Sequence, residues 1–219
     1  MNTLPVELLY EIQLWARSPA LPQVNRRFHQ IFSSSPPSYK AQYLYHVDDP
    51  LRYPIACDEK VLPLLPAPDR SPDLPRHLFR HLSPGKKYDK SHHPLPLLNF
   101  LYNNSSYPPN ANAHSGYALT KAVHAGFLPL VQFLLFHGAS PAHKNGLVVT
   151  IAIRQRNLHM VKILVEPQQK GNKKRKVEDR VKISPEMLRT AVKCKAKDIV
   201  DYFTQEKGCV PDMQTLYAL

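Results

Sequence analysis

Histidine and cysteine are the residue types in this chain that could hold a metal ion. His77 and His81 are four residues apart, a spacing that places two ligands on one face of a helix. Cys57 and the pair His92 and His93 lie in the same stretch of the chain. A structural zinc site needs four ligands at short spacings, and no second cysteine accompanies Cys57. We therefore expect packed or solvated histidines, with no metal and no cofactor.

Catalytic motifs are not visible in the sequence. The chain has only seven glycines, and none of them forms a G-x-G-x-x-G or phosphate-binding loop, so nucleotide-using enzymes are disfavoured. Serine, histidine and aspartate occur throughout, but a catalytic triad is recognised by its geometry and the sequence alone does not exclude one. We expect a protein that is not an enzyme and has no catalytic residues.

The strongest charge feature is a basic tract, K-G-N-K-K-R-K-V-E-D-R-V-K, at residues 170–182. Its seven Lys or Arg and two acidic residues give an excess of +5 within a net charge of +12. The other 206 residues hold 22 basic and 15 acidic groups, so the basic character is largely local. No aromatic residues alternate with these cations to stack on bases, and nucleic acid is an unlikely partner.

Composition and cysteine usage limit the compartment. A length of 219 residues with 43% hydrophobic content is enough to bury a core. The start, M-N-T-L-P-V-E, has no signal-peptide pattern, and no run of eighteen apolar residues occurs, so we expect neither secretion nor a membrane partner. The three cysteines, an odd number without a short-spaced pair, indicate free thiols in a reducing compartment: Cys57, Cys194 and Cys209. We expect a location in the nucleus, the cytoplasm or both.

Two short amphipathic helices are predicted at the N-terminus. The segment T-L-P-V-E-L-L-Y-E-I-Q-L-W-A-R-S has Thr3 as a cap and Pro5 in the first turn, followed by apolar residues at helical spacing: Leu4, Leu8, Leu9, Ile12 and Trp15. The segment A-L-P-Q-V-N-R-R-F-H-Q-I-F then sets four apolar residues on one stripe: Leu21, Val24, Phe28 and Ile31.

Proline divides the chain after these helices. Fourteen of the 22 prolines fall between Pro36 and Pro109. Because proline fixes φ and removes a backbone donor, this stretch cannot hold long uninterrupted helices. We expect an irregular connector, and we expect that either this connector or the N-terminal helical hairpin itself covers the first of the elements that follow.

Three copies of one pattern follow the connector, aligned on Ala122, Ala152 and Ala191. Apolar residues recur three residues before, nine after and twelve after each alanine: Leu119, Val149, Leu188; Val131, Val161, Val200; Leu134, Leu164, Phe203. The copies are 30 and then 39 residues apart, so residues 168–182 form an insertion. In the first copy Gly126 separates two predicted helices, where the first helix must stop and reverse.

The N-terminal segment resembles the F-box, a three-helix motif that opens with L-P-x-E-L-L-x-x-I and later shows V-x-R-x-F. The residues that match are Leu4, Pro5, Glu7, Leu8, Leu9, Ile12, Val24, Arg26 and Phe28. The chain is about three residues shorter than the motif between Ile12 and Val24. The resemblance implies that five residues dock on the linker protein of a cullin-RING, SCF-type ubiquitin ligase: Leu4, Pro5, Leu8, Leu9 and Ile12. An ordinary helical hairpin that only caps the rest of the protein is the alternative.

The C-terminal copies resemble degenerate ankyrin repeats, whose period is 33 residues. The first copy continues into Gly138-Ala139-Ser140-Pro141, similar to the loop of that family, whereas Arg156 and Lys195 replace the turn glycine in the other copies. Leu98, Phe100 and Leu101 precede matching residues by 33 positions and indicate part of a further repeat. The resemblance implies a protein-binding face, for which position suggests Tyr117, Lys121, His124, His143, Lys144, Asn145 and Arg154.

The basic tract has a resemblance of its own. Five consecutive residues look like a monopartite nuclear import signal of the kind that importin-α reads: Lys173, Lys174, Arg175, Lys176 and Val177. A solvated loop without a receptor is the alternative.

The sequence as a whole predicts an all-α chain with three regions: an F-box-like segment at 1–45, a proline-rich connector at 46–85 and three to four ankyrin-type repeats at 86–219. The function we expect is that of a non-enzymatic adaptor, the substrate receptor of an SCF-type ubiquitin ligase, with an unknown protein as substrate. A repeat scaffold or regulator in the nucleus, with no ligase connection, is the alternative, and nucleic-acid binding through residues 170–182 is a third.

Overall fold

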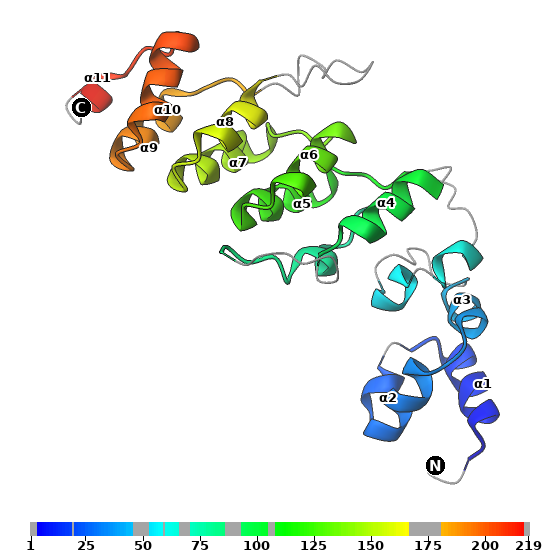
Figure 1. The fold of residues 1–219 in the computed structure, drawn as a ribbon. Helices are drawn as coiled ribbons and strands as arrows, with labels where there is room; N and C mark the ends of the chain where they lie inside the picture. The colour runs from blue at the N-terminus through cyan, green and yellow to red at the C-terminus, as the bar shows by residue number, and fades with distance from the viewer. Residues whose placement is uncertain are drawn as a thin grey trace. The chain divides into compact units, whose positions relative to one another are not determined.

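Helices form the regular secondary structure of this protein in a computed structural model that describes residues 4–18, 20–45, 53–58, 60–65, 71–85, 93–104, 108–166 and 181–216 (Figure 1). Within these ranges there is no strand, and one isolated bridge pairs Asp73 with Asn110. The prediction of an all-α chain is confirmed. The chain divides into two compact units, Met1–Pro72 with Leu97–Pro108, and Asp73–Pro96 with Pro109–Leu219.

The first unit contains short helices and turns. Its helices are α1 (Val6–Ala16), α2 (Arg26–Ser33), α3 (Pro37–Tyr45) and most of α4 (Leu95–Asn104). Single 3-10 turns connect them at η1 (Leu21–Gln23), η3 (Pro54–Cys57) and η4 (Leu62–Leu64), and each has a proline in its first two positions. Proline tolerates the first turn of a helix but not its interior, so this spacing of prolines gives short elements.

The second N-terminal helix begins later than its hydrophobic stripe predicts. Asn25 has extended backbone angles, and its side chain accepts a hydrogen bond from the Phe28 amide at 2.8 Å, which fixes the start of α2 at Arg26. Residues 21–23 form the separate turn η1 instead. Val24 consequently lies outside the helix and is exposed, although Phe28 and Ile31 pack as predicted.

A small core holds α1, α2 and α3 together. Leu9 packs with Phe28 and Phe32, whose rings lie 6.1 Å apart. Tyr10 stacks on Tyr39 of α3 at 4.3 Å between ring centroids. The Tyr39 hydroxyl donates to Oε1 of the buried Gln13 at 2.7 Å, which satisfies that polar group inside the core.

The second unit contains three helix pairs that follow one another: α5 (Ala113–Ala125) with α6 (Leu128–Phe136), α7 (His143–Arg154) with α8 (Leu158–Val165), and α9 (Pro185–Lys193) with α10 (Lys197–Asp201). Helix α5 packs against α7, and α7 packs against α9, so the first helices of the pairs form a row (Figure 1). A π-helical turn at Tyr202–Glu206 and the short α11 (Met213–Leu216) complete the chain as described.

The three aligned alanines mark the same turn in each pair. Their carbonyl oxygens accept hydrogen bonds from the amides five residues later, at 3.1, 3.2 and 3.0 Å for Ala122, Ala152 and Ala191. The residue in front of each donor has a left-handed backbone: φ is 72° at Gly126, 54° at Arg156 and 55° at Lys195. This is the Schellman arrangement that ends a helix. The alignment therefore predicted where each first helix stops.

The aligned apolar residues form the core of the second unit. All nine are buried except Val200, which is half-buried. Part of the proline-rich connector covers the row: the turn η5 (Arg76–Phe79) packs against α5, and Leu74, Phe79 and Leu82 are buried. The capping role expected of the connector is thus seen for residues 73–85.

Two turns of unusual backbone precede the regular part of α5 and α7. His114, Ser115 and Gly116 have φ of 54°, 58° and 72°, and the residues 30 positions later, Lys144, Asn145 and Gly146, have nearly the same angles. A Cβ on Gly146 would lie 2.4 Å from Cε of Met187, so the second turn sits directly against α9. The sequence alignment did not reveal this feature.

Candidate protein-interaction surfaces

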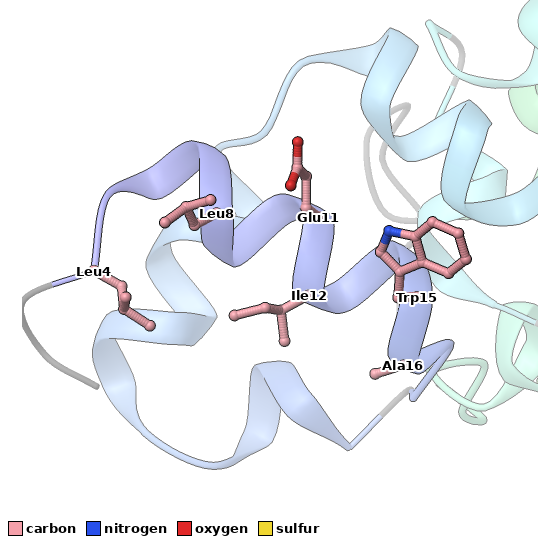
Figure 2. A pocket seen from close by; sticks show the side chains of 6 residues that line it. All are labelled: Leu4, Leu8, Glu11, Ile12, Trp15 and Ala16. Atoms are coloured by element: carbon pink, nitrogen blue, oxygen red, sulfur yellow. The ribbon is translucent and has the colours of Figure 1, made fainter.

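An open apolar groove lies along α1. It has a volume of about 560 Å³ and is lined by Leu4, Leu8, Glu11, Ile12, Trp15 and Ala16 (Figure 2). Leu8, Ile12 and Trp15 are 45%, 43% and 86% exposed, and their spacing of four and three residues puts them on one face of the helix. Contiguous exposed apolar surface of this kind is typical of sites that bind other proteins.

The opposite face of α1 explains why this groove stays open. Leu9, Tyr10 and Gln13 hold the helix against α2 and α3, so the neighbouring stripe of Leu8, Ile12 and Trp15 faces outward. Glu11 is the one charged residue in the lining. The groove therefore suits an apolar partner surface that ends near a positive or hydrogen-bonding group.

The five predicted docking residues do not all lie in this groove. Leu4, Leu8 and Ile12 line it. Leu9 is buried in the core, where it positions the helix, and Pro5 is exposed at the N-cap. Trp15, which the sequence analysis placed in the helical pattern but not among the docking residues, lines the groove. The sequence did contain a sign of this: Trp15 follows Leu8 by seven residues, a spacing that places both side chains on one face of a helix.

The residues predicted to form a binding face on the repeats fall mainly at the opposite ends of helices α5 and α7. Lys144 and Asn145 belong to the left-handed turn at the start of α7 and His143 directly precedes it, while Tyr117 is half-buried next to the equivalent turn of α5. His124 and Arg154 lie at the other helix ends and are exposed, while Lys121 is half-buried between the ends. The sequence predicted one binding face. The structure places these residues in two groups, separated by about 12 Å along the helix axes.

Asn112 organises the end that carries the left-handed turns. Its Nδ2 donates to the Gly138 carbonyl at 2.9 Å, and its Oδ1 accepts from the Ser140 amide at 2.7 Å. The His143 Nε2 lies 3.2 Å from the same oxygen. Tyr117 is held in place nearby by the Arg76 guanidinium, 5.6 Å from its ring centroid. This end is thus fixed by contacts within the protein, and the sequence analysis did not identify Asn112.

Ionisable groups at the last helix pair have structural roles. Hydrogen bonds from Thr215 and then Arg189 lower the pKa of Asp212 to about 2. Burial and the hydrogen bond to Glu166, at 3.0 Å, raise the pKa of Tyr202 above its ordinary value. These contacts join α9 to α11 and the π-helical turn to the end of α8. These groups are therefore paired with one another within the second unit.

The histidines of the connector do not assemble a metal centre among the residues described. His77 is half-buried in η5, and burial followed by the charge of Arg80 lowers its pKa. No group of three or more His, Cys, Asp or Glu close enough to hold a metal occurs within the described ranges. His92, the Cys57 side chain and the predicted import signal at Lys173–Val177 lie outside them. None of the helices in those ranges has the length and apolar character needed to cross a membrane.

Comparisons with known proteins add no relative: no protein-family model, no curated protein and no solved structure matches this chain.

Proposed function

We propose that this chain is a non-enzymatic adaptor that docks on the linker protein of a cullin-RING ubiquitin ligase through α1 and binds a protein substrate through its helix pairs. The observation that carries the proposal is the exposure of Leu8, Ile12 and Trp15 beside the groove, on a helix whose other face is anchored by Leu9. Three of the residues that the F-box resemblance assigns to docking line this groove: Leu4, Leu8 and Ile12.

The exposure of α1 also bears on the capping alternative. A hairpin that served only as a cap would bury Leu8 and Ile12 against the rest of the chain, yet both are more than two-fifths exposed. Within the second unit, the connector residues 73–85 pack against α5. Apolar groups left in water cost free energy, so an apolar partner for α1 is the simpler explanation of these residues.

The helix pairs support the substrate-binding half of the proposal. Their repeated turns and buried alanines agree with the resemblance to ankyrin repeats, proteins in which stacked helix pairs present an extended surface to a partner. In such an adaptor the ligase partners would carry out ubiquitin transfer. This chain would contribute only proximity and orientation.

The test is co-purification of the linker protein with the full chain and with a Leu8→Asp, Ile12→Asp variant. Both residues are exposed, so the variant keeps its fold, whereas Leu9→Asp would place a charge in the core. We expect binding to fall at least thirtyfold, because two apolar contacts are lost and two charges must be desolvated. Leu64→Asp is the matched control, since Leu64 is an exposed leucine of the same unit outside the groove.

Two results would decide against the ligase connection. Intact protein that captures no linker protein would leave a repeat scaffold or regulator as the function. Equal loss of binding in the Leu64→Asp control would show that the effect is not specific to the groove.

A nuclear address is also proposed, on the sequence of Lys173–Val177 alone. Fusing residues 168–182 to a reporter protein should direct it to the nucleus, and a fusion with Lys174→Ala and Arg175→Ala should remain distributed through the cell. A reporter that does not accumulate in the nucleus would remove the import signal from the proposal.

A further inference from the structure

The turns at the ends of α5, α7 and α9 carry basic residues at matched positions. Two residues after each aligned alanine stand His124, Arg154 and Lys193, and four residues after it stand Gly126, Arg156 and Lys195. The histidine and the four Arg or Lys side chains are all exposed. We define the basic edge as these five residues: His124, Arg154, Arg156, Lys193 and Lys195.

Packing of the helix pairs brings the basic edge into one row. The three turns share one backbone arrangement, and α5, α7 and α9 pack in that order. Nε2 of Gln155 donates to the His124 carbonyl at 2.8 Å, which ties the first turn directly to the second. The turns that end α5, α7 and α9 therefore follow one another in the order in which Figure 1 shows these helices.

The charges of the basic edge are not neutralised within the described part of the chain. The ion pairs found there join Lys162 to Glu206, Lys207 to Glu166 and Arg189 to Asp212, and none involves the basic edge. Residues 90–165 contain no aspartate or glutamate at all. Asp198 and Asp201 of α10 lie three and six residues after Lys195, whereas the nearest acidic residue after Arg156 is Glu166.

Backbone strain singles out two members of the basic edge. Arg156 and Lys195 have a left-handed conformation that glycine adopts without a steric cost and that residues with a Cβ disfavour. Gly126 stands at the matched position of the first turn. The helix dipole favours cations in a last turn, but it does not explain a side chain in place of the turn glycine. Strained residues of this kind are frequently functional.

We propose that the basic edge binds an extended acidic segment of a partner protein. Packed helices are about 8–10 Å apart, and an extended polyproline II segment, with three residues per turn and a rise of about 3.1 Å, returns a side chain to the same face about every 9 Å, so one acidic residue can meet each turn. Exposed aromatic side chains for stacking on bases are missing from these turns, because Phe127 is half-buried and packs 5.0 Å from His93. The inference deepens the proposed function by giving the chemical class of the substrate. It rests on the proposed function only in calling the bound protein a substrate.

The test measures binding of a fluorescent twelve-residue oligoglutamate peptide to the full chain by anisotropy. All proteins carry serine at residues 173–176, so that the basic tract does not compete. The Arg156→Gly, Lys195→Gly variant should bind at least tenfold more weakly while its thermal unfolding temperature stays the same or rises. Arg154→Gln, Lys193→Gln should also weaken binding. Arg17→Gly is the matched control, because Arg17 is an exposed cation with φ of 47° in the other unit, and it should bind normally.

Several outcomes would overturn this inference. Peptide binding by both edge variants that equals that of the parent is one such outcome, and an equal loss of affinity in the Arg17→Gly control is another. Peptide binding by the natural chain that is absent from the parent with serine at residues 173–176 would assign the binding to the basic tract. A 20-base-pair DNA duplex that binds more tightly than the peptide through the same residues would replace the acidic protein with nucleic acid. The Leu8→Asp, Ile12→Asp variant should bind the peptide normally, so a failure of the ligase proposal is distinguished from a failure of this one.

Discussion

Leu8 and Leu9 are adjacent in the chain, but Leu8 is 45% exposed in the groove of α1 whereas Leu9 is 2% exposed in the core with Phe28 and Phe32. One helix thus uses neighbouring leucines for two purposes: the second fixes its orientation, and the first is presented outward. The F-box resemblance gave both residues the same docking role, but only Leu8 is exposed in the groove, whereas Leu9 is buried.

The two leucines should respond differently to truncation. Leu9→Ala removes packed side-chain volume and is expected to lower the free energy of unfolding by about 2–5 kcal/mol. Leu8→Ala should lower it by less than about 1 kcal/mol, because much of its side chain is already in water. Urea denaturation of both variants measures the difference, and equal losses would contradict the orientation of α1.

Substitutions at the matched turns after α5 and α7 are expected to change the free energy of unfolding in opposite directions. Arg156→Gly should raise the free energy of unfolding by roughly 0.5–1 kcal/mol, because relief of the left-handed backbone exceeds the added entropy of glycine in the unfolded chain. Gly126→Ala should lower it by about 1 kcal/mol, although no atom lies within 4 Å of the added Cβ. Thermal unfolding of the two variants tests this, and a destabilised Arg156→Gly would argue against a strained turn.

The buried contact between Tyr39 and Gln13 can be tested with a double-mutant cycle. Tyr39→Phe leaves the Gln13 side chain buried without its donor and should cost about 1–3 kcal/mol. Gln13→Met added to Tyr39→Phe should recover most of that loss, because no unpaired polar group remains. Additive losses, measured by chemical denaturation, would show that the two groups do not interact.

Asn112 is expected to fix the loop that leads into α7. Asn112→Ala removes the acceptor of the Ser140 amide and the donor to the Gly138 carbonyl, with an expected cost of about 1–3 kcal/mol. Hydrogen exchange at Ser140 should accelerate, while exchange in α9 should change little. An unchanged rate at Ser140 would mean that Asn112 does not hold the loop.

Acid should remove the contribution of Asp212 to the stability of the folded protein. Its pKa in the folded protein, about 2, lies below the ordinary value of 3.8 because Thr215 and Arg189 stabilise the charged form. A lowered folded-state pKa adds stability above the unfolded value, and this stability is lost as the pH falls from about 4 towards 2. The parent should therefore lose more thermal stability than Asp212→Asn over that range in calorimetry, and parallel curves would contradict the assignment.

Hydrophobic spacing predicted the helix pairs well because each copy uses the same local chemistry. Ala122, Ala152 and Ala191 are small and buried, and the turn after each one closes through a backbone hydrogen bond that depends little on side chains. That is why Arg156 and Lys195 could replace glycine without moving the turn, a substitution that sequence reasoning read as a departure from the pattern.

The features that the sequence did not predict depend on contacts between distant residues. The left-handed turns at residues 114–116 and 144–146 are packed against His143 and Met187 respectively, which lie 27 and 41 residues after the two glycines. The start of α2 depended on which of several polar residues would cap it, and Asn25 could be identified only from its hydrogen bond to the Phe28 amide. Burial of Leu9 in place of Leu8 follows from the positions of α2 and α3.

The row of matched turns also has a consequence for how the second unit forms. Its contacts join residues within one helix pair or about 30 residues apart in the next pair, so its contact order is low and rapid folding is expected. Folding of such a row can nucleate in any pair and spread to its neighbours. The pair α7 and α8, which has a neighbour on each side, should therefore open last, and with it the turn that carries Arg154 and Arg156.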